Sequence, residues 1–455
     1  MKTKPEPTLT SYKEAAAFIF KLTNYEKTAD YKYDNAFKLD RVFSLLDHVD
    51  NPHQRLEAIH IAGTKGKGST AAMIASILSA GGFRVGLYTS PHLVSFRERI
   101  RVDGHAIPKT DFAALLNQLR PFITPPTETQ RCSHSFFDVL TVMAFMHFAR
   151  QEVDVAILEV GMGGRIDATN VIHPRVCVIT PISFDHTRHL GTDLTAIAAE
   201  KAGIIKPDCP TVTAPQPSEA MEVIRRVARE QNAPLIEVGT DVLWREKEKE
   251  RERERGRRGA GFEVVGMQET YRDLWVPLLG DHQRINAATA IAALEALGKT
   301  GRALSETTIR AGLAGTRALG RISVIGERPT VVLDVAHNPA SFRELRETLK
   351  KSFDFKRLLL VFALHKDKDA DGIIHELAPI VDYVFLPAID SPRIRPKEEL
   401  RGVFERHDIP CTETHTVAEA ISSAGRAADP DDLICIAGSF MLAEQAIEHF
   451  GMEVA

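Results

Sequence analysis

The chain has 455 residues, 44% hydrophobic and 26% charged, a balance typical of a folded globular protein with two or three domains. Its net charge of −4 gives no electrostatic reason to expect nucleic acid or an anionic membrane as a partner. No apolar run approaches the about 20 residues of a membrane-spanning helix.

Residues 1–14 (MKTKPEPTLTSYKE) contain no apolar core of the kind that directs export. The five cysteines are widely scattered and include no CxxC pair, which favours reduced thiols over a disulfide framework or a zinc site. We therefore expect a cytoplasmic protein.

A phosphate-binding loop is the first motif along the chain. An apolar strand ends at about Ala62, and the glycine-rich turn GTKGKGST (63–70) leads into a helical pattern that stops at Gly81-Gly82. Backbone N–H groups, the start of the helix, Lys67 and the hydroxyl of Ser69 or Thr70 together suit a nucleotide triphosphate with its magnesium ion. The spacing is not that of a regular Walker A motif, and an ordinary glycine turn before a helix is the alternative interpretation.

Short apolar runs then alternate with helical patterns, which indicates parallel strands covered by helices on both faces. The predicted strands of this first series lie at 57–63, 84–88, 154–160, 175–180 and 210–214, and the clearest helices at 136–151 and 193–205.

Polar side chains follow three of these strands. Ser90 comes after the second, Glu159 ends the third, and Asp185 and His186 lie beyond the fourth. Because ligands bind at the carboxyl ends of parallel strands, this hydroxyl, carboxylate and imidazole suit a cation beside the phosphates. Serine and histidine are also common turn residues, and this alternative stays open on spacing alone.

A second series of strands begins after about residue 320, at 321–326, 330–336, 357–364, 382–388 and 432–438. We place the domain boundary at Leu319-Gly320-Arg321, which gives domains at 1–318 and 322–455. Each is predicted to be a doubly wound α/β unit, with the ligand site in a cleft between them. The charged stretch 245–258 breaks the pattern and is predicted to be a solvated helical extension or a disordered insertion between two edge strands of a sheet.

Seven ordered blocks resemble the folylpolyglutamate synthase and dihydrofolate synthase family of the Mur ligase superfamily. They are GTKGKGST, TSPH, EVGMGGRIDATN, FDHT, EKAGIIK, GDHQRINAATA and DVAHNP. The resemblance implies an α/β protein with an N-terminal Mur-ligase-type phosphate-loop ATPase domain and a smaller Rossmann-like C-terminal glutamate-ligase domain. It also implies a cytoplasmic monomer.

The resemblance assigns functional residues to these blocks. It implies catalytic roles for Lys67, Lys201 and His186, with Lys201 carried as a carbamate. It implies two Mg²⁺ ions, one of them on Ser90, Glu159 and His186. The implied ATP-binding residues are Gly66, Lys67, Gly68, Ser69, Asn286, Arg321, Asp334 and His337. The implied pterin-side residues are Phe137, Asp138, Thr141, Ile166, Asp167 and Ala168.

Three positions depart from the family pattern as we know it. Lys65 stands where Asn is usual, Val335 where many members have Gly, and Asp138 where Glu is frequent. The additional charge of Lys65 lies in the phosphate loop itself, so it is the departure that bears on nucleotide binding.

The implied reaction joins the amino group of L-glutamate to a carboxylate of a folate or of dihydropteroate, splitting ATP through an acyl phosphate. The sequence leaves open which acceptor is used. The alternatives are a peptidoglycan-type Mur ligase and a non-ligase phosphate-loop ATPase. A nicotinamide-dependent oxidoreductase, suggested only by GMGG and Gly438-Ser439, is the weakest alternative.

Overall fold

A computed structural model describes residues 8–25, 38–123, 134–185, 187–191, 193–246, 259–298 and 304–452. His186 and most of the charged stretch 245–258 lie outside the described residues. Within the described part of the chain, no helix has both the length and the apolar character that a membrane crossing requires.

An eight-stranded sheet forms the centre of the first half of the chain, in the order β4-β3-β2-β5-β1-β6-β7-β8. Its strands are β1 (Ala58–Ala62), β2 (Val85–Tyr88), β3 (Ile100–Val102), β4 (His105–Ala106), β5 (Val155–Glu159), β6 (Val176–Ile179), β7 (Thr211–Thr213) and β8 (Leu235–Glu237). From β2 to β8 all neighbouring strands are parallel.

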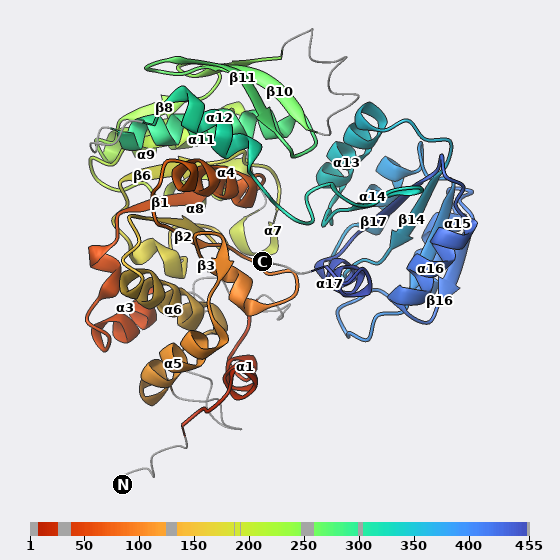
Figure 1. Ribbon diagram of the computed structural model, residues 1–455, viewed down its shortest axis with the longest axis horizontal. Helices are drawn as coiled ribbons and strands as arrows, with labels where there is room; N and C mark the ends of the chain where they lie inside the picture. Colours follow the sequence, from red (N-terminus) through yellow and green to blue (C-terminus); the bar gives the residue numbers. More distant parts are fainter. Residues whose placement is uncertain are drawn as a thin grey trace.

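Helices cover both faces of this sheet (Figure 1). One layer contains α1 (Tyr12–Phe20), α3 (Leu39–Asp47), α5 (Lys109–Leu119) and α6 (Phe136–Arg150). The opposite layer contains α4 (Lys67–Ala80), α11 (His282–Leu297) and α12 (Glu306–Ala314). The remaining helices are α7 (Thr187–Leu190), α8 (Leu194–Ala202) and α9 (Ser218–Glu230), with single turns η1 (Pro52–Arg55), η2 (Phe96–Arg99), η3 (Arg120–Phe122) and η4 (Ala168–Val171).

Alternate residues of the central strands pack against the two helix layers. Ala156 and Leu158 of β5 belong to the core with α6, whereas Val155 and Ile157 belong to the core with α4 and α11. Since every residue of β1 and β5 is buried, these strands are mostly apolar in the sequence, and His60 and Glu159 are their buried polar members.

The sheet is mixed rather than wholly parallel, which differs from the doubly wound prediction. Strand β3 runs antiparallel to β2, and the edge strand β4 runs antiparallel to β3. They are joined through Asp103-Gly104, where both φ angles are positive (50° and 81°), as a tight hairpin turn requires. A separate antiparallel sheet, β11-β10-β9, was also not predicted; its strands are β9 (Leu243–Arg245), β10 (Ala260–Val265) and β11 (Thr270–Val276).

The second half of the chain contains a six-stranded sheet in the order β12-β13-β17-β14-β15-β16. Its strands are β12 (Ser323–Gly326), β13 (Thr330–Leu333), β14 (Leu358–Phe362), β15 (Tyr383–Pro387), β16 (Cys411–Thr414) and β17 (Leu433–Ala437). Only β12 is antiparallel to its neighbour. Its helices are α13 (Pro339–Ser352), α14 (Ala370–Leu377), α15 (Lys397–Glu405), α16 (Val417–Ala427) and α17 (Phe440–His449).

Candidate active site

The phosphate loop joins the end of β1 to the start of α4. Gly66 is the N-terminal cap of α4 in the left-handed conformation (φ 82°), and a Cβ there would overlap the amide of Asn286 on α11. The backbone N–H groups of Thr64 and Lys65 both donate to the carbonyl of Pro181, at 3.0 and 3.1 Å. The glycine therefore allows close packing on α11, and the loop is fixed to the segment after β6.

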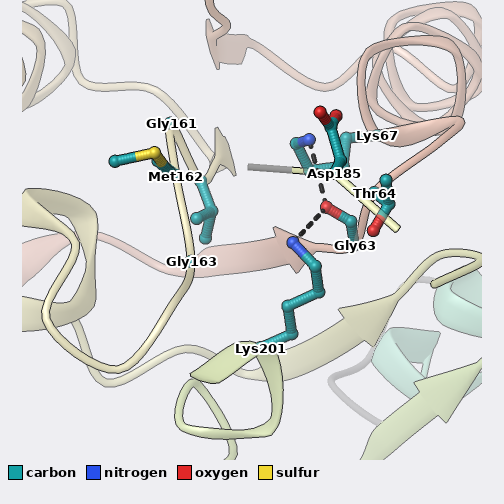
Figure 2. Close-up of a pocket in the computed structure, with 9 residues that line it drawn as sticks. Gly63, Thr64, Lys67, Gly161, Met162, Gly163, Asp185 and Lys201 are labelled. Atoms are coloured by element: carbon teal, nitrogen blue, oxygen red, sulfur yellow. Dashed lines mark hydrogen bonds between the residues drawn. The ribbon is translucent and has the colours of Figure 1, made fainter. Parts of the chain in front are cut away.

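Two lysines converge on one carbonyl of this loop. Nζ of Lys67 and Nζ of Lys201 donate to the carbonyl oxygen of Gly63 at 3.1 and 2.9 Å (Figure 2). Lys201 reaches it from the end of α8, 138 residues away. They line a small cavity with Gly63, Thr64, Val160, Gly161, Met162, Gly163 and Asp185.

Burial decides the protonation of Lys201. Its side chain is only 5% exposed, and burial, assisted by the neighbouring charge of Lys67, lowers the pKa of Lys201 to about 7. A substantial fraction of this amine is therefore neutral near neutral pH, in contrast to a surface lysine.

Glu159 and Ser90 lie beside the same loop. The backbone N–H of Ser90 donates to Oε2 of Glu159 at 3.1 Å, so the ends of β2 and β5 are joined at this point. Glu159 is 4% exposed, and burial raises its pKa while the charge of Lys67 opposes that rise. A Cβ on Gly68 would lie 3.6 and 3.7 Å from the two carboxylate oxygens, which places Glu159 against the first turn of α4.

This pair fits a hard cation, since a carboxylate and a hydroxyl offer oxygen ligands next to a phosphate loop. The described residues contain no cluster of three or more histidine, cysteine, aspartate or glutamate side chains that could hold a metal. The predicted magnesium ligands are not a cluster of this kind. Of the three, only Glu159 is both an acidic, histidine or cysteine side chain and a described residue, because Ser90 offers a hydroxyl and His186 lies outside the described residues.

The loop that carries Ser90 is held by residues that the sequence analysis did not single out. The carboxylate of Glu98 accepts the backbone N–H groups of Leu93 and Val94, both at 2.9 Å, and that of Ser95. The spacing S-x-x-E at 95–98 is a capping-box pattern and was readable in the sequence.

The second domain supplies Arg321, Asp334 and His337. A Cβ on Gly68 would lie 3.9 Å from the guanidinium of Arg321, so Arg321 extends to the start of α4. Asp334 accepts the backbone N–H groups of Ile322 and Ala336 at 2.8 and 2.7 Å. Nδ1 of His337 donates to the carbonyl of Val335 at 2.9 Å, and burial lowers the pKa of His337 to about 4, so its ring is neutral.

The predicted pterin-side residues meet at the glycine loop after β5. The ring of Phe137 lies so close to Gly161 that a Cβ there would be 2.6 Å from it. The buried carboxylate of Asp167 accepts the backbone N–H groups of Gly161 and Met162 at 3.1 and 3.0 Å. Ala168 is buried beside it and Ile166 is partly buried. A role of these residues in substrate binding stays a prediction.

Asp138 and Thr141 also have partners within the fold. Asp138 forms a reciprocal cap with Ser135 at the start of α6, and burial raises the pKa of Asp138 to about 6. The hydroxyl of Thr141 lies 3.1 Å from that of Tyr88 on β2. Both therefore stabilise the start of α6 against the sheet.

Comparison with known proteins identifies the family. Residues 61–294 match the Mur ligase middle domain, and residues 320–440 match the Mur ligase, glutamate ligase domain. The chain is 37% identical over 399 residues to the dihydrofolate synthase/folylpolyglutamate synthase of Bacillus subtilis, covering 87% of this chain and 88% of that protein. The chain belongs to the folylpolyglutamate synthase/dihydrofolate synthase family.

Further relatives agree with this family assignment. The Mycobacterium tuberculosis dihydrofolate synthase/folylpolyglutamate synthase is 39% identical over 379 residues, covering 80% of this chain and 76% of that protein. Among solved structures, M. tuberculosis folylpolyglutamate synthase complexed with ADP and AMPPCP superposes with a TM-score of 0.83, at 37% identity over 92% of this chain and 97% of that one. Escherichia coli FolC in complex with DHPP and ADP superposes with a TM-score of 0.84, at 30% identity, covering 97% of this chain and 98% of that one.

The chain is thus an ATP-dependent glutamate ligase of the folylpolyglutamate synthase/dihydrofolate synthase type, and its fold is that of the Mur ligases. The alternatives of a peptidoglycan ligase, a motor or switch ATPase and an oxidoreductase are set aside by this family assignment.

Proposed function

We propose that this chain activates a carboxylate of a folate or of dihydropteroate as an acyl phosphate and then transfers it to the amino group of L-glutamate. The observation that carries the proposal is the convergence of Lys67, Lys201 and Glu159 on the loop between β1 and α4. A carboxylate is a poor electrophile, and ATP corrects this by supplying a phosphate leaving group.

Charge neutralisation is the main demand of the phosphoryl transfer. Lys67 places one ammonium at the loop, and the N-terminus of α4 directs backbone N–H groups there. Glu159 and Ser90, with His186, would hold Mg²⁺, which supplies positive charge to the phosphates when bound. Arg321 adds a cation from the second domain beside Gly68.

Lys201 is the candidate for a carbamate, as the family resemblance implies. A carbamate forms when the neutral amine adds CO₂, and a lysine with a pKa of about 7 offers that neutral form near neutral pH. The modification would replace a cation with an anion in the cavity, where it could orient a second Mg²⁺.

The acceptor is tested by offering folate and dihydropteroate separately. We expect ADP release that depends on L-glutamate, with a product heavier by one glutamate residue in the mass spectrum. ADP release without glutamate incorporation, with both acceptors, would contradict the proposal.

The phosphate loop is tested by Lys67→Ala. Loss of one cation from a site with little water should lower kcat about 10²-fold or more. The control is Lys356→Ala, whose ammonium pairs with Asp431 at the surface of the second domain. Equal turnover in the two variants would remove Lys67 from the mechanism.

The metal is tested by Glu159→Gln. This change removes a ligand charge but keeps the shape, so the Mg²⁺ concentration needed for half-maximal activity should rise. Binding of the folate acceptor, measured separately by calorimetry, should change little. An unchanged magnesium titration would mean that Glu159 is structural.

A further inference from the structure

The side chain of Lys65 connects the two domains. Lys65 lies in the phosphate loop, and its Nζ donates to Oδ1 of Asn338 at 3.0 Å. Asn338 precedes α13 in the second domain. The backbone N–H of Lys65 donates to Pro181, so the base of this side chain is fixed to the first domain.

Hydrogen bonds at the start of α13 hold the side chain of Asn338 in place. It is the N-terminal cap of α13, and its Oδ1 accepts the backbone N–H of Ser341 at 2.9 Å. The hydroxyl of Ser341 in turn accepts the backbone N–H groups of His337 and Asn338 at 3.2 and 3.1 Å. The oxygen that Lys65 contacts therefore belongs to a rigid helix start and not to a mobile side chain.

Further charged contacts hold α13 to the first domain along its length, among them Lys351 with Glu246 at 3.5 Å. Nζ of Lys351 lies 2.7 Å from Asp281, and Glu344 lies 3.5 Å from His282, at the start of α11. Asp281 and Glu344 are 64% and 59% exposed, so these pairs are weak. The Lys65 contact differs from them because it begins in the loop that holds the phosphates.

The charges around Lys65 come from both domains. The side chain lies among two other cations, Lys67 and Arg321, and near Asp185 and Asp334. Burial is the main cause that lowers the pKa of Lys65 to about 8, and the two cations add to it. A positive group at the positive end of a helix is unfavourable unless an anion is near, and the carboxylates of Asp185 and Asp334 supply that negative charge.

We propose that Lys65 is a positioning residue. It holds the N-terminus of α13, and with it the glutamate-ligase domain, in a fixed position relative to the phosphate loop. This inference rests on the glutamate ligation proposed above. The family match makes residues 320–440 the glutamate ligase domain, so in this proposal the second domain brings L-glutamate to the acceptor that is activated at the phosphate loop. Loss of the contact should therefore affect the use of glutamate more than the binding of ATP.

A double-mutant cycle tests this proposal. Lys65→Met removes the ammonium and keeps most of the side-chain length. Asn338→Ser keeps an N-cap acceptor for α13, but its side chain is shorter and does not reach Lys65. We expect each variant to lower kcat/KM for glutamate about tenfold, the size of one charge-assisted hydrogen bond. The double variant should have about the same kcat/KM for glutamate as the less active of the two single variants, because both changes remove the same contact.

Rescue and controls separate positioning from other roles. Asn338→Asp keeps both the cap and an acceptor for Lys65, so it should retain most of the activity. Lys356→Met, at an exposed surface pair, should resemble the wild type. The dissociation constant for ADP should change less than threefold in Lys65→Met. If Lys65→Met does not fold, Lys65→Asn takes its place in the cycle.

Three results would overturn the proposal. Multiplicative losses in the double variant would mean that the two residues act independently. A loss confined to nucleotide affinity would make Lys65 a phosphate ligand only. Full activity of both single variants would leave the contact without a role. If the wild type gave no glutamate-dependent ADP release, the proposed function would fail first, so the two failures are distinguishable.

Discussion

Lys201 is the residue whose environment most strongly restricts its chemistry. It is buried, it donates to the carbonyl of Gly63, and its pKa is lowered to about 7. Lys201→Ala should lose the chemical step if the amine is carbamylated. Lys201→Arg keeps a positive charge but cannot carry a carbamate, so it should be as impaired as the alanine variant. Single-turnover ligation rates measure both.

An active Lys201→Arg variant would contradict the carbamate proposal. An arginine variant with much of the wild-type rate would mean that the residue is an ordinary cation at the phosphate site. Added small carboxylates should restore part of the activity of Lys201→Ala, but not of Lys67→Ala, because only the former lacks an anion.

His60 begins a buried chain of hydrogen bonds under the glycine loop. Its Nε2 lies 2.8 Å from the hydroxyl of Thr169, and that hydroxyl donates to Asp167 at 2.6 Å. Since the hydroxyl proton is directed to Asp167, Nε2 of His60 must be the donor to Thr169. Asp167 then holds the N–H groups of Gly161 and Met162, so a strand residue indirectly fixes the loop beside the cavity.

A pH-dependent stability follows from the burial of His60, which lowers its pKa from 6.5 to about 3. Between these values the unfolded chain binds a proton that the folded chain excludes. The free energy of unfolding should therefore fall as the pH falls below 6.5, by up to about 1.4 kcal/mol per unit from this group. His60→Gln keeps a donor but does not titrate.

Urea unfolding of the wild type and of His60→Gln between about pH 7 and pH 5 measures this difference. The variant should show the shallower loss of stability. Other buried histidines, such as His337, contribute to both proteins equally, so only the difference reports on His60. Parallel curves would show that His60 does not carry the effect.

The helix α4, which begins at the phosphate loop, packs closely on α12. A Cβ on Gly312 of α12 would lie against the backbone of Ile77, and Ser76 donates to the carbonyl of Gly312 at 2.6 Å. Gly312→Ala should therefore force the two helices apart and lower the melting temperature by several degrees. Weaker ADP binding should accompany it if the N-terminus of α4 binds the phosphates, as proposed above.

Gly425→Ala is the matched control, since Gly425 lies in helix α16 with no atom of the described residues within 4 Å of an added Cβ. Replacing an exposed helical glycine by alanine should stabilise the protein by about 0.5–1 kcal/mol. Thermal unfolding followed by circular dichroism measures both variants. The same shift in both would show that packing on Ile77 is not the cause.

Strands and helices with a strong apolar periodicity were predicted from the sequence, whereas short antiparallel strands, which depend on pairing with a neighbouring strand, were not. The buried strands β1, β5 and β6 and the helices α4 and α6 lie where apolar spacing placed them. The predicted strands did not include the hairpin β3–β4, although Asp103-Gly104 is a turn signal for it. The sheet β9–β11 was harder, because 14 positions at 246–259, all charged residues or glycines, separate its first two strands.

At the scale of the molecule, the sequence predicted that several of the blocks lie together, but not which side chains cross between domains. Lys67, Lys201, Ser90 and Glu159 meet because parallel strands place their carboxyl ends together. The contact of Lys65 with Asn338 joins residues 273 positions apart, and no local pattern encodes it. Nor did periodicity show that Leu93 and Val94, from the Ser90 loop, pack against the core of the second domain.

Leu93 therefore connects the cation site to the position of the second domain. Its side chain lies at the linker, where a Cβ on Gly320 would be 3.5 Å from Leu93 and 3.2 Å from Val335. Leu93→Ala should weaken this packing by about 1 kcal/mol and lower kcat about fivefold, because Arg321 then loses its fixed position at the start of α4. Affinity for ADP should fall as well, and the radius of gyration measured by small-angle X-ray scattering should increase. Met267→Ala, at the exposed turn between β10 and β11, is the control for loss of apolar surface. A drop in ADP affinity without a change in size would instead place the effect of Leu93 within the first domain.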